Sequence, residues 1–453
     1  MNKRKFTMLA ALSIMLFVTG CSGSRNEESS KKLKLITAFD PFTFSSYFGG
    51  NQFELTHPEY EVAYVNANLP IDADYWDKYI GLLESEKPDV IAIGNIFDYY
   101  KLASAGLLKD MSAMIRKDGF DLNVVDPTIV SLLKYPGEPS ELLGLAPFFN
   151  PSALYYNKTL FGKYGVPLPE GEMTWEQMLR LASRFPNRNE QGARLYGYHH
   201  RAFSTPGFYL DYISQLEGLS ATDGIHLTMG DARWRTIADQ LLQAFKLNAV
   251  SYAKNDGEVR FDDPESGGDV PFLDGRVAMM EADALFMSRL DQSKPGFEWG
   301  IAPKFVSLDR SKGMPSYPSM IYAIYRDAAN VDAAWAYIRY MNDPATLKLL
   351  SKSVPQLPAQ KDIGDERLGR NLEPFYATKA IPPSIADANK PMVVSPYFHS
   401  QKLNPIIDEE FAQALEGTKG LDDMIAAIRS RGQKAYEQAL AEFRAAESES
   451  ESE

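Results

Sequence analysis

The sequence has very little cysteine, with a single residue of this type among 453, at position 21. That count excludes internal disulfides and zinc sites built from thiolates. Basic residues are outnumbered, with 47 Lys and Arg against 60 Asp and Glu, and the net charge is −13. Such a surplus of negative charge repels phosphate backbones, so nucleic acid is not expected as a partner. The chain is long enough for two or three domains.

Motifs that mark common enzyme classes are also missing. The sequence contains no Gly-x-Ser-x-Gly, His-Glu-x-x-His, Walker or Gly-x-Gly-x-x-Gly pattern. Only five histidines are present, and the adjacent pair His199-His200 has no neighbouring ligand set. We therefore interpret this pair as polar surface rather than a metal site. Neither a cofactor nor a resident metal is expected.

An acidic, Gly-rich stretch without apolar periodicity runs from 255 to 269. Its carboxylates include Asp262, Asp263, Glu265 and Asp269. These residues lack the spacing of an EF-hand loop. We interpret the stretch as a solvated acidic loop, with a weak Ca²⁺ site as the alternative.

The one long apolar stretch lies at the start of the chain. Residues 2–5 are mostly basic, and residues 6–18 are mostly apolar, which is shorter than the roughly 20 residues that span a bilayer. Val18-Thr19-Gly20-Cys21 follows and resembles a bacterial lipobox. This resemblance implies cleavage before Cys21 and lipidation of that cysteine, and an ordinary signal peptide is the alternative. We expect a signal peptide at 1–20 and a polar tether at 21–32.

The body of the chain alternates between helix and strand patterns. Residues 74–84 have helical apolar spacing, and the apolar run 90–94 is typical of a strand that is buried on both faces. Helices on either side of such a strand predict an α/β fold. Trp76, Trp175 and Trp335 lie on the apolar faces of expected helices, so we assign them to the core.

Several segments, in order along the chain, resemble the family-1 extracellular solute-binding proteins of ATP-driven importers. They cover about residues 33–360. The segments are Lys87–Ile91 with Ala105–Asp110, Ala153–Leu160 with Tyr164–Pro167 and Thr174–Gln177, Phe272–Met280, Trp299–Pro303, and Asp332–Ile338.

This resemblance implies a type II periplasmic-binding-protein-like fold, in which two α/β lobes are joined by hinge strands. We place the N-terminal lobe at 33–146 and 303–354, and the C-terminal lobe at 147–302 and 355–446. The chain is then expected to cross between the lobes near Leu145–Pro147, Trp299–Pro303 and Val354–Pro358. Residues 447–453 alternate Glu and Ser and are expected to form a disordered acidic tail.

The resemblance also implies a function. The protein would capture a carbohydrate, an oligosaccharide or sugar derivative, between its lobes and deliver it to the permease subunits of an ABC transporter. It would be a monomer, and the lipid on Cys21 would anchor it at the outer face of the cytoplasmic membrane. Two alternatives stay open: a secreted carbohydrate-active hydrolase, which needs a pair of carboxylates, and a ligand-sensing co-receptor with the same fold.

Candidate cleft residues are aromatic and polar side chains that follow expected strands, because sugars are bound by flat rings and by hydrogen-bonding groups. The candidates are Asp40, Phe42, Asn95, Asp98, Tyr99, Asn150, Asp283, Phe286, Tyr317, Tyr397 and Phe398. For Asp40 and Phe42 the alternative is a packed loop, and for Asn150 it is a helix cap. Many family members have a sugar-stacking tryptophan where this chain has Phe286, which follows Ala282-Asp-Ala-Leu.

Overall fold

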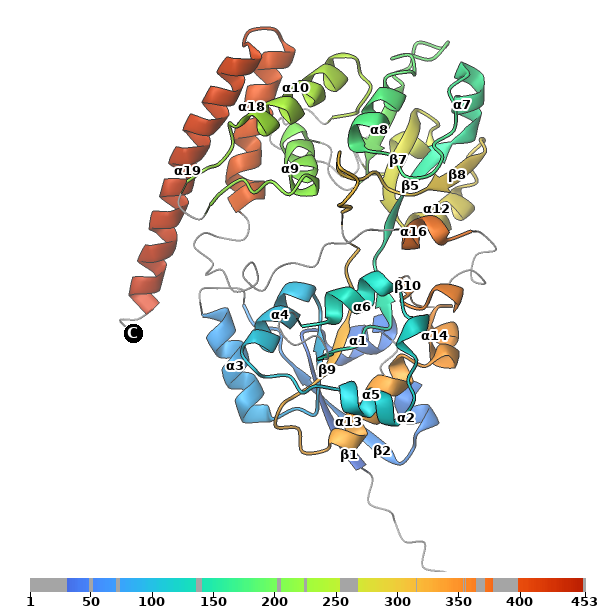
Figure 1. The fold of residues 1–453 in the computed structure, drawn as a ribbon, viewed down its shortest axis with the longest axis vertical. Coiled ribbons are helices and arrows are strands. Elements are labelled where there is room, and N and C mark those ends of the chain that lie inside the picture. The colour runs from blue at the N-terminus through green and yellow to red at the C-terminus, as the bar shows by residue number, and fades with distance from the viewer. Residues whose placement is uncertain are drawn as a thin grey trace, which may run out of the picture.

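A computed structural model of the chain describes residues 31–48, 52–70, 74–135, 141–201, 205–223, 226–252, 268–314, 316–352, 354, 356–363, 371–377 and 398–450. The described residues form two lobes, each built around a four-stranded sheet with flanking helices (Figure 1). Cys21, Tyr397 and most of the acidic stretch 255–269 lie outside these residues.

The first lobe is built from the N-terminal part of the chain and from residues 321–363. Its strands are β1 (Lys31–Thr37), β2 (Tyr60–Asn66), β3 (Val90–Ile93) and β9 (Ile321–Ile324). Its helices are α1 (Pro41–Phe48), α2 (Gln52–Thr56), α3 (Tyr75–Glu86), α4 (Ile96–Ser104), α5 (Ser112–Lys117), η1 (Leu122–Val124), α6 (Pro127–Leu133), α13 (Val331–Met341) and α14 (Pro344–Leu350).

The second lobe contains the middle and the end of the chain. Its strands are β5 (Ser152–Asn157), β6 (Tyr196–His200), β7 (Val277–Asp283) and β8 (Trp299–Ala302). Its helices are α7 (Lys158–Tyr164), α8 (Trp175–Ala182), α9 (Pro206–Leu216), α10 (Ala232–Lys246), α11 (Val270–Leu273), α12 (Leu285–Ser293), η2 (His399–Leu403), α18 (Asn404–Leu415) and α19 (Leu421–Ser450).

Each sheet mixes parallel and antiparallel pairs. In the first lobe the strand order is β2-β1-β3-β9, in which β1 is parallel to both neighbours and β9 is antiparallel to β3. In the second lobe the order is β6-β7-β5-β8, in which β6 and β7 are parallel and β5 is antiparallel to both neighbours. All four residues of β3 are buried, as its continuous apolar run predicts.

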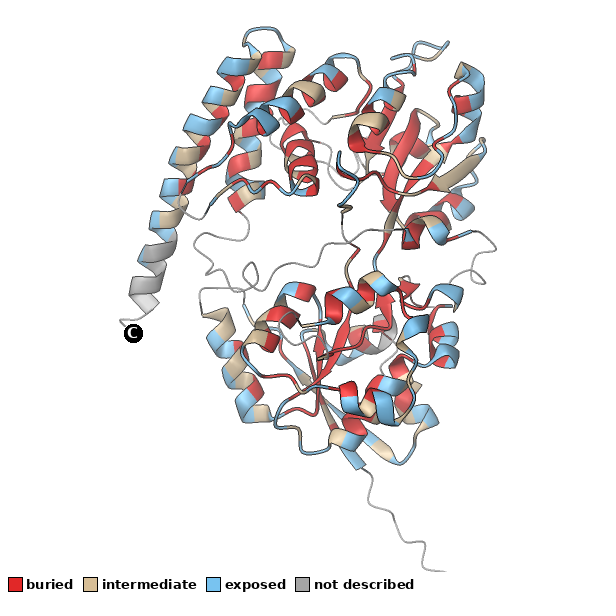
Figure 2. Ribbon diagram, in the orientation of Figure 1, coloured by how far each residue is buried: buried red, intermediate tan, exposed pale blue. Residues whose placement is uncertain are grey.

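The cores follow the sheets. Buried residues concentrate on the strands and on the inner faces of the helices (Figure 2). Trp175 and Trp335 are buried core residues, as expected, and their indole nitrogens donate to Glu217 and Asp118. Trp76 on α3 is only partly buried, and the ammonium of Lys101 lies over its ring at 4.9 Å from the centre.

Three segments run side by side where the lobes join. Strand β4 (Phe148–Phe149) pairs antiparallel with β10 (Leu357–Pro358), and Pro318 forms a bridge with Phe149. Helix α16 (Glu373–Tyr376) links the lobes at this point. Its Phe375 ring packs against Tyr155 of β5, and its Tyr376 ring packs against Phe149.

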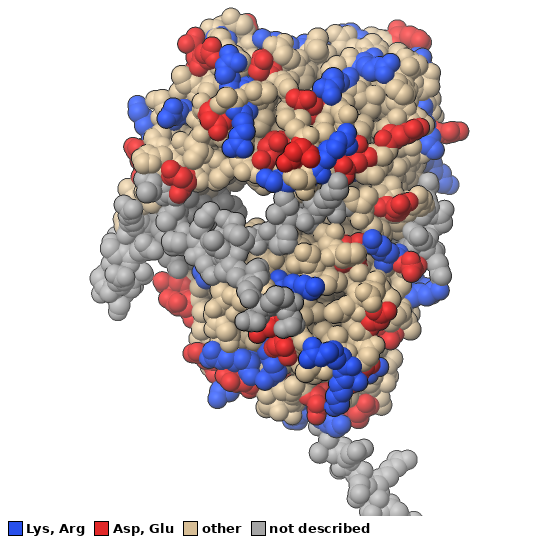
Figure 3. Space-filling model, viewed as in Figure 1, with Lys and Arg blue, Asp and Glu red and all other residues tan. Residues whose placement is uncertain are grey.

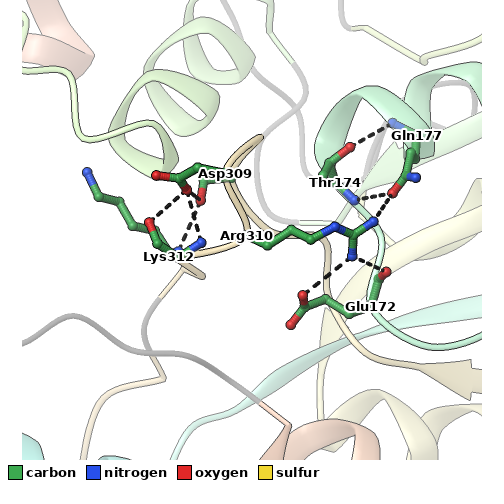
Figure 4. Close-up of polar contacts among 8 residues, drawn as sticks. Glu172, Thr174, Gln177, Asp309, Arg310 and Lys312 are labelled. Carbon is green, nitrogen blue, oxygen red and sulfur yellow. Dashed lines mark hydrogen bonds and ion pairs between the residues drawn. The ribbon is translucent and has the colours of Figure 1, made fainter.

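Residues 303–314 belong to the second lobe, so the predicted crossing at Trp299–Pro303 is wrong. Phe305 is buried in the second core, and Val306 is buried and forms a bridge with Thr174. Arg310 donates to the backbone carbonyl of Glu172 and to the amide oxygen of Gln177 (Figure 4). Gln177 is itself held in the expected capping box with Thr174. The crossing lies beyond these contacts, around Tyr317.

The predicted crossing at Val354–Pro358 contains β10, which lies where the lobes join, but the chain does not leave the first lobe directly after this strand. Ala359 donates to Pro147, and Gln360 donates to the backbone of Asn342 in the first lobe. Residues 356–363 therefore remain with the first lobe. At the other end, α19 continues to Ser450, so residues 447–450 are helical where the acidic repeat predicts disorder. Within the described part of the chain, no helix combines the length and hydropathy needed to cross a membrane.

Candidate functional site

The carboxyl ends of the two sheets face the junction between the lobes. In the first lobe Ile93, the last residue of β3, pairs with Ile321, which follows the junction segment at Tyr317. In the second lobe Ser152 begins β5, three residues after β4, and pairs with Asp283 at the end of β7. Ligands bind in the crevice beyond the carboxyl ends of strands in such folds. The interlobe cleft is therefore the candidate site.

A cavity of about 570 Å³ opens at this end of the second sheet. It is lined by Ser152, His200, Arg201, Gly268, Asp269, Val270, Glu281, Ala282, Asp283 and Arg289. Most of these residues are polar or charged, and several come from the ends of β6 and β7. The cavity therefore offers many hydrogen-bonding groups on the second-lobe side of the cleft.

Two arginines and two aspartates form a chain of ion pairs in this cavity. The Nε atom of Arg201 lies 2.5 Å from Asp269, and its Nη1 atom lies 2.8 Å from Asp283. Asp269 also pairs with Arg289 at 2.8 Å. The Asp269 carboxylate is buried, so its two cations compensate a charge that burial alone would disfavour.

A second polar group lies behind this chain. Glu281 is buried and accepts hydrogen bonds from Ser152 and Tyr212. Burial lowers the pKa of His200 and the pKa of Lys304, while the charge of Glu281 opposes both shifts. The ammonium of Lys304 donates to the backbone of Met314 at 2.9 Å. Two hydroxyl donors therefore hold the Glu281 carboxylate in place at the cavity wall.

Asp283 lies in the cavity, as the sequence predicts, but Phe286 does not. The Phe286 ring is fully buried, and it packs edge-on against Tyr155 at 5.1 Å and against Phe272 at 5.7 Å. The guanidinium of Arg201 lies over the ring, 5.8 Å from its centre. The expectation of a ligand-stacking ring at this position is wrong, because the residue belongs to the core.

The first lobe supplies exposed aromatic rings. Phe42 on α1 is 80% exposed and Phe97 on α4 is 50% exposed, and their helices follow the neighbouring strands β1 and β3. The Phe97 ring lies 6.1 Å from that of Tyr317, which is partly buried. Figure 3 shows an opening between the lobes, with acidic and basic side chains on its second-lobe edge.

Several of the predicted polar candidates serve the backbone instead. Asp40 accepts from the backbone of Thr43 in the first turn of α1, and hydrogen bonds from the side chain and the backbone of Thr43 lower the pKa of Asp40. Asn95 caps α4 by accepting from the backbone N–H of Asp98. Asp98 is half-buried, and burial raises the pKa of its carboxyl group. Asn95 and Asp98 stay near the carboxyl end of β3, where a ligand could also reach them.

The remaining candidates divide into exposed and core positions. Asn150 is exposed beside the junction, and its backbone donates to Tyr317. Tyr99 and Phe398 are buried and are not cleft residues. The Tyr99 hydroxyl donates to the backbone of Leu133, and the Phe398 ring packs against Tyr436. These two predictions are wrong because the rings point into the lobes' cores.

The interpretation of the histidine pair as polar surface is also wrong. His199 is fully buried, and its ring nitrogens contact Ser251 at 2.5 Å and the backbone of Gly268 at 2.8 Å. Asp269 is likewise buried rather than solvated. Among the residues that the structure describes, no group of three or more His, Cys, Asp or Glu is arranged to hold a metal ion.

Sequence reasoning missed Arg201, Glu281 and Phe97. Glu281 interrupts the apolar run of β7 that precedes Asp283, and a carboxylate within such a run signals a buried polar contact. Phe97 lies two positions after the Asn95 cap and one position before the predicted Asp98. Arg201 follows the end of β6, but a sequence gives no indication that two distant aspartates meet it.

The chain matches the model of the bacterial extracellular solute-binding protein family over residues 43–348. It therefore belongs to this family and is a solute-binding protein rather than an enzyme. The hydrolase alternative is set aside on that ground. A search of curated proteins found no match.

Solved structures share the fold at low sequence identity. An open sugar transporter structure from Rhizobium etli has a TM-score of 0.61 at 19% identity, covering 89% of this chain and 99% of that one. The sugar-binding protein MalE from Xanthomonas citri has a TM-score of 0.60 at 14% identity, with coverages of 91% and 99%. An ABC substrate-binding protein from Listeria monocytogenes, in complex with cycloalternan, has a TM-score of 0.54 at 18% identity, with coverages of 89% and 97%. These likenesses establish the two-lobed type II fold.

Proposed function

We propose that the protein captures a carbohydrate in its interlobe cleft and delivers it to the permease subunits of an ABC importer. The observation that carries this proposal is the pairing of unlike surfaces across the cleft. Exposed Phe97 and partly buried Tyr317 provide apolar rings on one side, and Arg201 and Asp283 in the second-lobe cavity provide hydrogen-bonding groups on the other. A sugar ring presents the matching combination of an apolar face and hydroxyl edges.

The structural relatives support the same ligand class. Two of the proteins named above are described as sugar-binding or sugar-transporting, and the Listeria protein is in complex with cycloalternan. Hinge closure of two lobes around a ligand is the behaviour of periplasmic binding proteins. In this chain, closure would bring the rings of the first lobe onto a sugar already held in the second-lobe cavity.

The same proposal includes attachment to the membrane. The single cysteine follows an apolar segment in a lipobox-like sequence. A lipid on Cys21 would hold the monomeric receptor on the outer face of the cytoplasmic membrane. Tethering of this kind raises the effective concentration of the receptor beside its permease.

A ligand screen tests the proposal. Purified protein is heated with maltose, cycloalternan or α-D-tagatose, and an active ligand at 100 times its Kd should stabilise the protein by about 2.7 kcal/mol. A protein without a sugar site, measured in the same solutions, corrects for general stabilisation by excluded solutes. X-ray scattering with the active sugar should show a smaller radius of gyration. An unchanged radius in a saturated sample would contradict closure.

Loss of uptake on deletion would then separate transport from sensing. A strain that lacks the protein should stop importing the bound sugar. Normal import together with a lost transcriptional response would favour the co-receptor alternative.

A further inference from the structure

The first observation concerns the face of Phe286 that points toward the cavity. The ring is enclosed by Tyr155 and Phe272, and the Arg201 guanidinium lies over it at 5.8 Å from the centre. A planar cation on an aromatic face is a stable arrangement. The surface that a ligand meets here is therefore a guanidinium group and not an aromatic ring.

The second observation is that this guanidinium is fixed in place. Asp269 and Asp283 accept from its Nε and Nη1 atoms at 2.5 and 2.8 Å, which sets the plane of the group. The Arg201 side chain remains 28% exposed. A guanidinium has five N–H groups, so donors remain for a ligand after these two bonds. Because the group is already ordered, a ligand meets no further cost for ordering it.

The third observation is the balance of charge. The carboxylates of Asp269, Glu281 and Asp283 line the cavity together with Arg201 and Arg289. Among the described residues that line the cavity, three carboxylates therefore face two guanidinium groups. An anionic ligand group that approached Arg201 would have two carboxylates within hydrogen-bond distance of the same guanidinium.

We propose that Arg201 determines the specificity of the second lobe by donating hydrogen bonds to the hydroxyl groups of a neutral, polyhydroxylated ligand. Its two paired aspartates make the site discriminate against the corresponding sugar acid. This inference rests on the proposed function, since it assumes that a carbohydrate enters the cleft. It narrows the ligand class to neutral sugars and polyols and excludes uronides.

Neutral sugars and their acids provide matched probes. Binding of glucose and glucuronate, galactose and galacturonate, and maltose and maltobionate is measured by titration calorimetry. The wild-type protein should bind at least one neutral sugar, and its affinity for the corresponding acid should be at least about 10-fold lower. Arg201→Gln should lower the affinity for that sugar by about 10- to 100-fold, which is the range for loss of a hydrogen bond from a charged donor. Arg201→Lys keeps the charge but loses the planar fork, so it should also bind more weakly than wild type.

The Arg201→Gln variant is expected to fold, because Arg289 still neutralises the buried Asp269 carboxylate. Arg233→Gln is the matched control. Arg233 lies on α10 with its side chain 66% exposed and pairs with Asp231 at 3.8 Å, so its loss should change neither affinity nor melting temperature. Asp283→Asn removes one of the competing carboxylates, so it should improve binding of the acid relative to the neutral sugar.

Each outcome is decisive. Equal affinity of wild type and Arg201→Gln for the bound sugar would overturn the role of Arg201. Wild-type protein that binds an acid as tightly as its neutral partner would overturn the discrimination. If the wild-type protein binds none of the six probes and none of the sugars of the ligand screen, the proposed carbohydrate function is overturned. The inference about Arg201 then falls with it.

Discussion

Replacing Phe286 with alanine should destabilise the protein rather than remove a ligand contact. The side chain is fully buried, and its ring contacts Tyr155, Phe272 and the Arg201 guanidinium. Truncation of a buried Phe to Ala costs about 3–5 kcal/mol, because it removes buried apolar surface and leaves a cavity. Since a whole domain is stable by only about 5–15 kcal/mol, this is a large fraction of the total.

The melting temperature gives a direct measure of this loss. For a unit of 150–250 residues, 1 kcal/mol corresponds to about 2–4 °C. A loss of 3–5 kcal/mol therefore corresponds to a drop of about 6–20 °C in melting temperature, if the second lobe unfolds as one unit of that size. Differential scanning calorimetry would show whether the transition of this lobe alone shifts.

Phe42→Ala is the matched control, because it makes the same substitution at a side chain that is 80% exposed. Surface substitutions of this kind usually change stability by less than about 0.5 kcal/mol. The two variants should therefore differ by several degrees in melting temperature. A Phe286→Ala protein that melts like wild type but binds its sugar much more weakly would falsify the core assignment and restore the ligand-stacking role.

Two further outcomes are expected. Cys21→Ser should move the protein from the membrane fraction to the soluble fraction after a salt wash, and retention on the membrane would contradict a lipid anchor on that residue. Burial lowers the pKa of His199 from 6.5 to about 4, so the unfolded state binds more protons between these values. Stability should therefore be highest above about pH 6.5 and fall by about 3 kcal/mol toward pH 4, since one unit corresponds to 1.36 kcal/mol. The His199→Gln variant should lose less of its melting temperature between pH 7 and 4, and an equal loss would contradict this assignment.

The fold was predictable from the sequence because its signals are local. The apolar run at 90–93 becomes the buried strand β3, and Thr174 and Gln177 form the capping box that their spacing predicts. The lobe crossings were less predictable. Residues 303–314 stay with the second lobe because Arg310 and Val306 contact residues 172–177, more than a hundred positions earlier. Nothing local in the sequence marks such a contact.

The candidate site shows the same division between local and distant information. Position after a strand correctly brought Asp283 to the cavity, because the end of a strand is fixed by the sheet. The position of a residue after a strand does not determine whether its aromatic side chain points into the cleft or into the core. Tyr99 and Phe286 lie within four residues of cleft positions, yet helix geometry turns both side chains into the core. Residues one or two positions along a helix face different directions, so a proximity argument alone misassigns rings there.

The two lobes contribute different chemistry, and this bears on why closure is needed. The second-lobe cavity holds preordered hydrogen-bonding groups around Arg201, but the guanidinium of Arg201 covers the ring of Phe286. The exposed rings lie on the first lobe, where Phe42 and Phe97 follow adjacent strands. A sugar bound to either lobe alone would satisfy only its hydroxyl groups or only its apolar face. In the proposed function, both sets of contacts would form only when the lobes approach, so the free energy of binding would favour the closed state. A ligand with the wrong chemistry on either side would not stabilise that state.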